Sequence, residues 1–208
     1  ARDTAGEQQA VEVKQRVGAQ RLSRYHFSHH LIRLYLLNRI DLLEQAYLHE
    51  AVGLALENLY GERAPEIAVQ LAYHFEQAQL PEKAQPYYKL AAEGAAGRYA
   101  NRLAVDYFSK ALAALEHGEA AERFELLSGR ERLYDLLGER ELQRADLQAL
   151  GALAQRAQDP RLLAQAALQT GAFAMNTGEP SAALQQAQAA VRSLGAEGPH
   201  PDSIHLLV

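Results

Sequence analysis

The stretch from residue 65 to residue 195 is a succession of helix-length segments with very short breaks between them. Each segment carries apolar residues at helical spacing over about 14 to 18 residues, and each break is about two to four residues long. We predict helices near 66–79, 82–98, 101–117, 122–137, 140–157, 161–177 and 180–195. Because short connections force consecutive helices to run antiparallel, this stretch is expected to fold as a stack of helix pairs.

The breaks and the composition both favour helices. The breaks contain Leu80-Pro81, Gly138, Asp159-Pro160 and Gly178-Glu179-Pro180, which are residues typical of helix ends. The 208 residues include 39 Ala and 33 Leu, against 15 Val, Ile and Thr together. Ala and Leu are strong helix formers, whereas β-branched residues favour strands. The predicted fold class is therefore all-α.

The beginning of the chain is less regular. We predict a helix over Gln8–Val17 and then a strand over Arg21–Phe27, where apolar and polar residues alternate imperfectly. Ser28 is placed to cap a further helix that runs to about Leu36. This strand is the only one that the sequence indicates.

A long helix is predicted next. Asp41 and Glu44 form a variant of the capping box, and Gly61 ends the helix after Tyr60. The residues on its apolar side are Leu43, Tyr47, Ala51, Leu54 and Leu59.

Charge, hydropathy and cysteine content exclude several classes of protein. The formal net charge is −5 and no third of the chain is net basic, which argues against a nucleic-acid-binding face. No window approaches the ~18 to 20 apolar residues of a membrane span, and the first ten residues are polar, unlike a signal peptide. The lack of cysteine excludes disulfides, thiolate zinc sites and cysteine nucleophiles. We expect a cytoplasmic protein without nucleic-acid or membrane contacts. Because no Met starts the chain and it stops in mid-pattern, we also expect a piece of a larger protein.

The helical stretch resembles the tetratricopeptide repeat (TPR), a helix–turn–helix unit of about 34 residues. Small residues let the two helices of a unit approach closely, and large residues fill the space between units. Residues 65–98 match through Leu71, Ala72, Phe75, Ala84, Tyr88 and Ala91. Residues 85–117 match in the same register through Tyr88, Ala91, Ala92, Ala104, Phe108 and Ala111. Residues 164–195 match through Gly171, Gly178, Ala183 and Ala190. The resemblance implies a right-handed superhelix of antiparallel helix pairs.

The repeats are degenerate. Ala68, Thr170 and Ala187 stand where the pattern has larger residues. Residues 124–157 agree at Leu127, Tyr134, Gly138, Leu147 and Leu150. They disagree at Glu131 and Gln143, which occupy places where the pattern has small residues. The alternative fold is a generic alanine-rich helical bundle.

A second resemblance concerns the first half of the chain. The run Tyr25-His26-Phe27-Ser28-His29-His30-Leu31-Ile32-Arg33 is similar to the end of the winged-helix subdomain in signal-transduction ATPases with numerous domains (the STAND class). Ser28-His29-His30-Leu31 also resembles the Met-His-Asp-Leu motif of these ATPases, with His30 in the Asp place. Further similar landmarks include Tyr47–Val52, Ala55–Gly61 and Ala68–Phe75. The resemblance implies a winged-helix remnant at 1–40, a linking helix at 41–64 and a TPR-like array at 65–208.

The same resemblance assigns a role to one histidine. His29 would contact the β-phosphate of ADP in the inactive full-length regulator, which is bacterial and is often fused to a cyclase, kinase or DNA-binding output domain. The phosphate-binding motif G-x-x-x-x-G-K-[ST] is not in this chain. ATP or ADP is therefore expected only in an upstream domain, and this segment is expected to carry no cofactor and to be no enzyme.

Other chemistry has weak sequence support. His26 and His30 are four residues apart, a spacing that suits zinc when both lie on one helix, but the predicted strand-to-helix break falls between them. Glu119, Glu122 and Glu125 lie near a predicted helix start, where acidic residues stabilise the helix dipole. No metal site is predicted.

A binding surface follows from the TPR resemblance, in which fixed positions of each first helix line a concave face. These positions are Glu66, Val69, Tyr73, Glu76, Lys89, Glu93, Ala96, Gln165, Leu168, Ala172 and Met175. The set is mixed to apolar, so a clamp for a peptide's terminal carboxylate is not supported. An apolar peptide, a neighbouring domain of the same chain and a neutral small-molecule inducer all fit this surface.

We therefore hypothesise a non-catalytic sensor and interaction arm of a larger ATP-dependent bacterial signalling or transcriptional regulator. The alternatives are a stand-alone TPR adaptor and a histidine-based metal enzyme. Residues 196–208 are expected to form a loop before another repeat, with Ser203–Val208 as its first turn.

Overall fold

The computed structural model describes residues 10–17, 20–27, 30–115 and 119–195. They form a β-hairpin followed by helices, in two compact units, Ala1–Tyr87 and Tyr88–Val208. The elements are β1 Ala10–Val17, β2 Gln20–Phe27, α1 His30–Leu37, α2 Leu42–Tyr60, the 3-10 helix η1 Gly61–Ile67, α3 Ala68–Gln77, α4 Pro81–Ala96, α5 Asn101–Ala114, α6 Ala120–Leu137, α7 Arg140–Ala157, α8 Pro160–Asn176 and α9 Pro180–Gly195. Each helix predicted between 66 and 195 is present, with ends that agree within three residues.

The hairpin corrects the prediction for the first residues. Gln8–Val17 was expected to be helical, but β1 pairs antiparallel with β2 from Ala10↔Phe27 to Val17↔Gln20. The physical reason is the alternation of Val11 and Val13 with polar residues, since β-branched side chains favour a strand. The predicted strand over Arg21–Phe27 is confirmed as part of β2.

Helix α2 begins and ends where predicted. The Asp41 carboxylate accepts a hydrogen bond of 2.8 Å from the backbone N–H of Glu44. Gly61 follows the last residue of α2 with a φ of 50°, a conformation that glycine adopts without strain. Helix α2 packs against α3, and the ring of Phe75 lies against the backbone of Gly53. A Cβ at Gly53 would lie 2.9 Å from that ring, so the absence of a side chain permits the contact.

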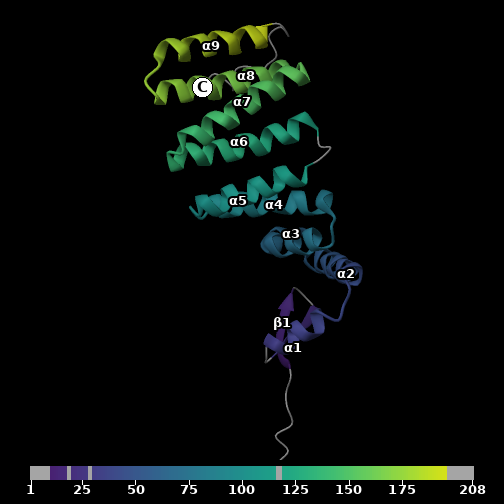
Figure 1. Cartoon of the computed structure of the whole chain (residues 1–208). Coiled ribbons are helices and arrows are strands. Elements are labelled where there is room, and N and C mark those ends of the chain that lie inside the picture. Colours follow the sequence, from purple (N-terminus) through teal and green to yellow (C-terminus); the bar gives the residue numbers. More distant parts are fainter. Residues whose placement is uncertain (1–9, 18–19, 28–29, 116–118, 196–208) are drawn as a thin grey trace, which may run out of the picture. The chain divides into compact units, whose positions relative to one another are not determined.

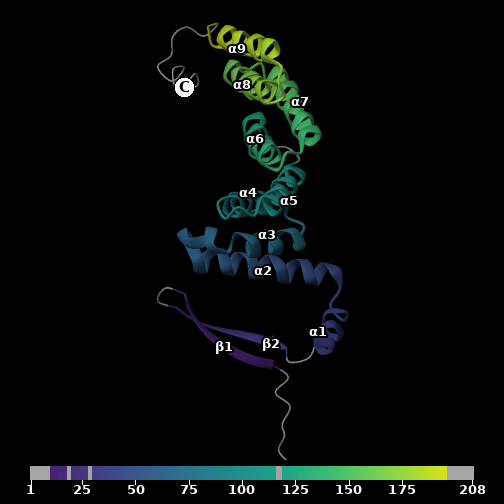
Figure 2. The ribbon, with the colours of Figure 1, turned by 90° about the vertical axis from the view of Figure 1, so that its left-hand side faces the viewer.

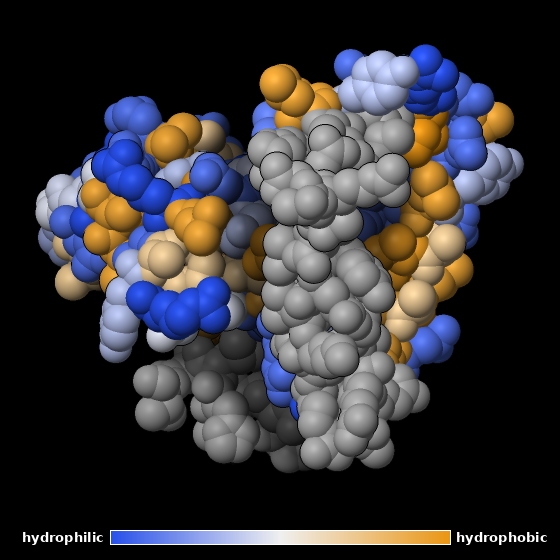
Figure 3. All heavy atoms as spheres, turned by 90° about the horizontal axis from the view of Figure 1, so that it is seen from below, coloured by the Kyte–Doolittle hydropathy of each residue, from blue (hydrophilic) through white to orange (hydrophobic). Residues whose placement is uncertain are grey.

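The apolar side predicted for α2 does not form a core. Leu43 and Tyr47 are 66% and 63% exposed, and Leu54 is also exposed. The side of α2 that is buried instead centres on Gly53, because the Phe75 ring needs a position without a side chain. Figure 3 shows such hydrophobic side chains, in orange, at the molecular surface among hydrophilic ones in blue. Unit 1 therefore presents an apolar surface.

In the second unit, α5 to α9 pack each on the next in chain order. Figures 1 and 2 show these helices as successive layers. Gly138 and Gly178 have φ of 72° and 81° at the ends of α6 and α8, and the Asp159 carboxylate caps α8 at the backbone N–H of Arg161. None of the helices in the described ranges is both long and apolar enough to cross a membrane. Apart from the hairpin, the fold is all-α and built from antiparallel helix pairs.

The small residues of the repeat pattern occupy the buried positions that the pattern predicts. Ala72, Ala92, Ala104, Ala111 and Ala190 are fully buried, as are the larger Leu71 and Phe75. The α8–α9 pair depends on Gly171, where a Cβ would lie 3.3 Å from the Gln186 Cβ and 3.5 Å from the Ala183 carbonyl oxygen. This burial confirms the register of the repeats.

The two disagreements in residues 124–157 compensate each other. Glu131 on α6 and Gln143 on α7 are 5% and 2% exposed, and the Gln143 amide donates a hydrogen bond of 2.7 Å to the Glu131 carboxylate. Burial raises the pKa of Glu131, an effect that the hydrogen bond from Gln143 opposes. A buried hydrogen bond thus replaces the contact between small residues at this helix pair.

A second polar contact joins three helices. The Arg130 guanidinium on α6 donates two hydrogen bonds to the Asp146 carboxylate on α7, of 2.9 and 2.7 Å, and one of 2.9 Å to the Ser109 hydroxyl on α5. The Asp146 side chain is 6% exposed, so the pair lies largely out of water. Because this geometry is bidentate, it fixes direction as well as distance.

The packing of α5 on α6 generates a prediction. A Cβ at Gly129 would lie 2.6 Å from the buried Phe108 ring, whereas a Cβ at Gly151, in α7, meets nothing within 4 Å. Overpacking costs about 1 to 3 kcal/mol and the gain in helix propensity is about 1 kcal/mol. We expect Gly129→Ala to lower the free energy of unfolding in urea denaturation and the matched control Gly151→Ala to raise it. Equal stabilisation by both substitutions would contradict the described packing.

Candidate functional site

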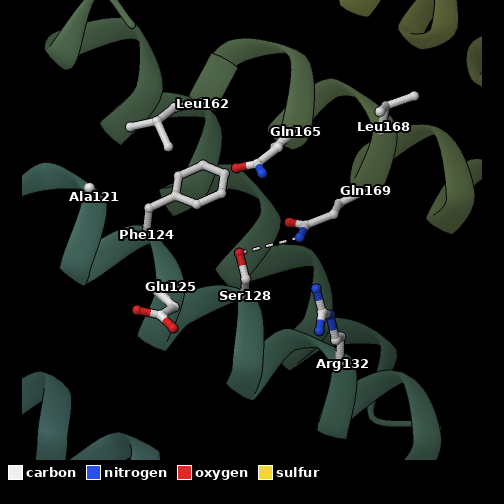
Figure 4. A pocket seen from close by; sticks show the side chains of 9 residues that line it. All are labelled: Ala121, Phe124, Glu125, Ser128, Arg132, Leu162, Gln165, Leu168 and Gln169. Atoms are coloured by element: carbon white, nitrogen blue, oxygen red, sulfur yellow. Dashed lines mark hydrogen bonds between the residues drawn. The ribbon is translucent and has the colours of Figure 1, made fainter. Parts of the chain in front are cut away.

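A hollow of about 470 Å³ lies between α6 and α8. Its lining residues are Ala121, Phe124, Glu125, Ser128, Arg132, Leu162, Gln165, Leu168 and Gln169. In Figure 4, Phe124 and Leu162 lie together at one end, and Arg132 and Gln169 lie at the other. We call this site the α6–α8 hollow. It has an apolar end and a polar end.

The polar end contains an unpaired buried atom. The Gln169 amide nitrogen donates a hydrogen bond of 3.2 Å to the Ser128 hydroxyl. The Gln169 Oε1 atom is buried and has no hydrogen-bond partner. Turning the amide over would give Ser128 the oxygen and leave the nitrogen unpaired instead. Either orientation leaves one amide atom without a partner, and an unpaired buried polar atom costs about 1 to 3 kcal/mol.

The two charged residues that line the hollow differ in whether an ion-pair partner neutralises them. Glu125 is bound to Lys89 of α4 at 2.6 Å, whereas Arg132 is exposed and has no ion-pair partner among the residues that the structure describes. Glu125 and Arg132 are seven residues apart, which is about 10 Å along a helix. The net local charge at the polar end is therefore positive.

The predicted groove residues lie on η1, α3, α4 and α8. Gln165 and Leu168 line the α6–α8 hollow, and Lys89 is held against its rim by Glu125. Ala172 and Met175 are exposed farther along α8, and Glu93 is exposed on α4, where Ala96 is half-buried. Val69, Tyr73 and Glu76 are exposed on α3, but Glu66 lies in η1 and not in the helix predicted for it.

Sequence reasoning missed the residues that α6 contributes. Glu125, Ser128 and Arg132 stand 40 residues before Gln165, Leu168 and Ala172. They occupy the same helix positions, and they were not proposed because residues 124–157 fit the repeat poorly. Applying the groove positions to that degenerate repeat would have found them.

Only some of the residues singled out around the histidines near the chain start lie among those that the structure describes. His29, assigned to nucleotide sensing, lies outside the described residues, as do Ser28 and the segment 196–208. His26 belongs to β2 and His30 is the first residue of α1, so the two do not share a helix. Within the described ranges, no group of three or more His, Asp and Glu is arranged to hold a metal ion.

A different pair of histidines lies in the first unit. The Nδ1 atoms of His49 on α2 and His74 on α3 are 3.0 Å apart, and the Tyr73 ring contacts both imidazoles. Because one nitrogen must donate and the other accept, the contact requires an unprotonated acceptor. Burial lowers the pKa of both histidines, and the charge of His49 lowers the pKa of His74 further.

Comparison with known proteins adds little to the assignment of fold or function. No protein-family model and no curated protein matches the chain. Among solved structures, the chain is similar to one described as "Crystal structure of MamA", with 12% sequence identity and a TM-score of 0.47. The match covers 73% of this chain and 92% of that chain. A likeness at this level carries no argument about function, so the assignment of the fold rests on the helix packing.

The histidine pair predicts a pH dependence. Each folded-state pKa lies below the ordinary value of 6.5, so its stabilising contribution is present above pH 6.5 and is lost as pH falls through the folded-state pKa. Between pH 7.5 and pH 5.5, we expect the melting temperature of His74→Gln to fall less than that of the unchanged chain. The control His30→Gln, at an exposed histidine outside this contact, should keep the acid sensitivity of the unchanged chain. Equal acid sensitivity of all three proteins would show that the pair does not titrate as described.

Proposed function

We propose that this chain is a non-catalytic protein-interaction module of TPR-like helix pairs, and that the α6–α8 hollow binds a segment of a partner protein. The observation that carries the proposal is the lining of the hollow. It combines the predicted groove residues Gln165 and Leu168 with Glu125 and Ser128, which stand at the equivalent positions of the preceding repeat. Lys89 and Glu93, which stand at the same positions of α4 within the second unit, would extend this binding surface.

Binding fits the polar groups of the hollow better than catalysis does. The Ser128 hydroxyl contacts the amide of Gln169, which cannot accept its proton as a general base does. Arg132 is a cation that can attract a ligand, but it cannot deprotonate a nucleophile. These features of Ser128 and Arg132 support recognition of a ligand rather than its activation.

Peptide display tests this proposal. A random peptide library is panned against the immobilised chain, and the selected clones are then tested against two variants. Gln165→Trp places an indole in the hollow, and Leu184→Trp makes the same kind of change on α9, at a side chain that is 61% exposed. We expect selected peptides to lose at least tenfold in affinity for Gln165→Trp and to bind Leu184→Trp unchanged. Equal binding to both variants, with both shown to be folded by circular dichroism, would contradict a site in this hollow.

We further propose that the module is the sensor arm of a larger, cytoplasmic, ATP-dependent bacterial regulator of the STAND class. Two observations support this. Strand β2 leads into α1 within a few residues, which is the order of elements in the resemblance around His29. In addition, Leu31, Leu42 and Leu43 are at least 66% exposed, an apolar surface that suits contact with a neighbouring domain. In this proposal His29 senses ADP held by an upstream domain, and a partner or inducer in the groove biases the ATPase.

The source DNA decides between this regulator and a stand-alone adaptor. For the regulator, we expect the coding sequence upstream of Ala1 to contain a G-x-x-x-x-G-K-[ST] motif followed by an acidic strand, since the phosphates need that cradle. A start codon just before Ala1 and a stop codon soon after Val208 would instead support the adaptor. The interaction module itself would stand in either case.

A further inference from the structure

The α6–α8 hollow has the dimensions and polarity of a short stretch of extended polypeptide. Its α8 wall runs from Leu162 to Gln169, seven residues or about 10 Å along a helix. At about 3.3 Å per residue, that length corresponds to about three residues of extended chain. A peptide of this length presents both side chains and peptide groups to the two helices.

The apolar end of the hollow specifies one side chain of such a ligand. Phe124 and Leu162 are buried and lie side by side in Figure 4, with Ala121 at the same end, whereas Leu168 lies toward the other end. An aliphatic or aromatic side chain placed there would gain about 25 cal/mol for each Å² of apolar surface removed from water. This end therefore selects an apolar anchor residue.

The middle and the polar end of the hollow specify two further groups of the ligand. The unpaired amide atom of Gln169 needs a donor or an acceptor, depending on its orientation, and a peptide group offers both. Arg132 lies beyond it without an ion-pair partner in the described chain, whereas the nearest acidic side chain of the lining, Glu125, is already bound to Lys89. The uncompensated charge favours a carboxylate on the ligand.

We propose that the α6–α8 hollow recognises an internal, extended acidic segment of a partner protein. An apolar side chain rests against Phe124 and Leu162, an adjoining peptide group bonds the Gln169 amide, and an Asp or Glu about three residues away pairs with Arg132. Since the segment is internal, its recognition does not require a free chain terminus. The inference rests on the proposed interaction function and adds the chemistry of the ligand.

The test uses end-blocked peptides, acetylated and amidated, of ten residues in a Gly/Ser background. Each carries one Leu or Phe and, two to four positions away, one Glu or one Lys. Binding to the chain is measured by fluorescence anisotropy at low and high salt. We expect the Glu peptides to bind at least tenfold more tightly than the Lys peptides, and the difference to shrink at high salt.

Two variants and one control locate the recognition. Arg132→Glu should reverse the preference in favour of Lys peptides. Arg102→Glu makes the same change of charge at an exposed residue of α5 outside the hollow, and it should keep the preference for Glu peptides. Gln169→Met keeps the size of the side chain but removes its amide, so affinity for every peptide should fall about five- to tenfold.

Three results would overturn the inference. They are equal binding of Glu and Lys peptides, equal effects of Arg132→Glu and Arg102→Glu, and no binding of any peptide to the unchanged chain. If peptides from the display library still lose affinity for Gln165→Trp, the interaction site stands and only the acidic preference is wrong. If Gln165→Trp has no effect on them, the proposed function itself fails.

Discussion

The ion pair between Arg130 and Asp146 fixes the helix on which the candidate site depends. Arg130 lies on α6 and Asp146 on α7, Arg130 also donates a hydrogen bond to Ser109 on α5, and the pair is largely buried. Removing one partner of a buried pair costs about 3 to 5 kcal/mol because the other charge is left without compensation. Arg130 is two residues from both Ser128 and Arg132, about 200° around the helix. When Arg130 is held against α7 and α5, Ser128 and Arg132 are therefore turned toward α8.

The candidate site also requires that neighbouring helices approach one another closely. The chain meets it with residues that lack bulk, such as Gly129 beneath the Phe108 ring and Gly171 beside α9. Where α6 and α7 carry the long side chains of Glu131 and Gln143, the two bond each other in the interior. Helix α7 packs on both α6 and α8 and so sets the spacing of these two helices. The hollow between them thus follows from the packing of the stack.

The helices and their short connections could be predicted from sequence because hydrophobic spacing, Pro and Gly are local signals. Strand β1 could not be distinguished from a helix by its sequence. Apolar and polar residues alternate there over only a few positions, and Val11 and Val13 are the main evidence for that alternation. The buried side of α2 was also mispredicted. The sequence shows which side of α2 is apolar, but it does not show which side faces a neighbouring helix. That side is set by the contact between Gly53 and the distant Phe75.

Only part of the candidate site was predicted, again because a contact between residues distant in the sequence decides the rest. Gln165 and Leu168 were placed in the groove from their repeat positions, and both line the hollow. The α6 wall was not proposed, because Glu131 and Gln143 made its repeat look poor. The two residues are 12 positions apart on different helices, and their hydrogen bond is visible only in three dimensions. A long-range compensation of this kind leaves no local signal in the sequence.

The central claim is that the α6–α8 hollow is the surface that receives a partner. Amide chemical shifts of the ¹⁵N-labelled chain, recorded while a display-selected peptide is titrated in, test it most directly. The account predicts that the largest shifts fall within 121–132 and 162–169, the two walls of the hollow. Shifts confined to the exposed apolar surface of α1 and α2, with the hollow unchanged, would contradict it.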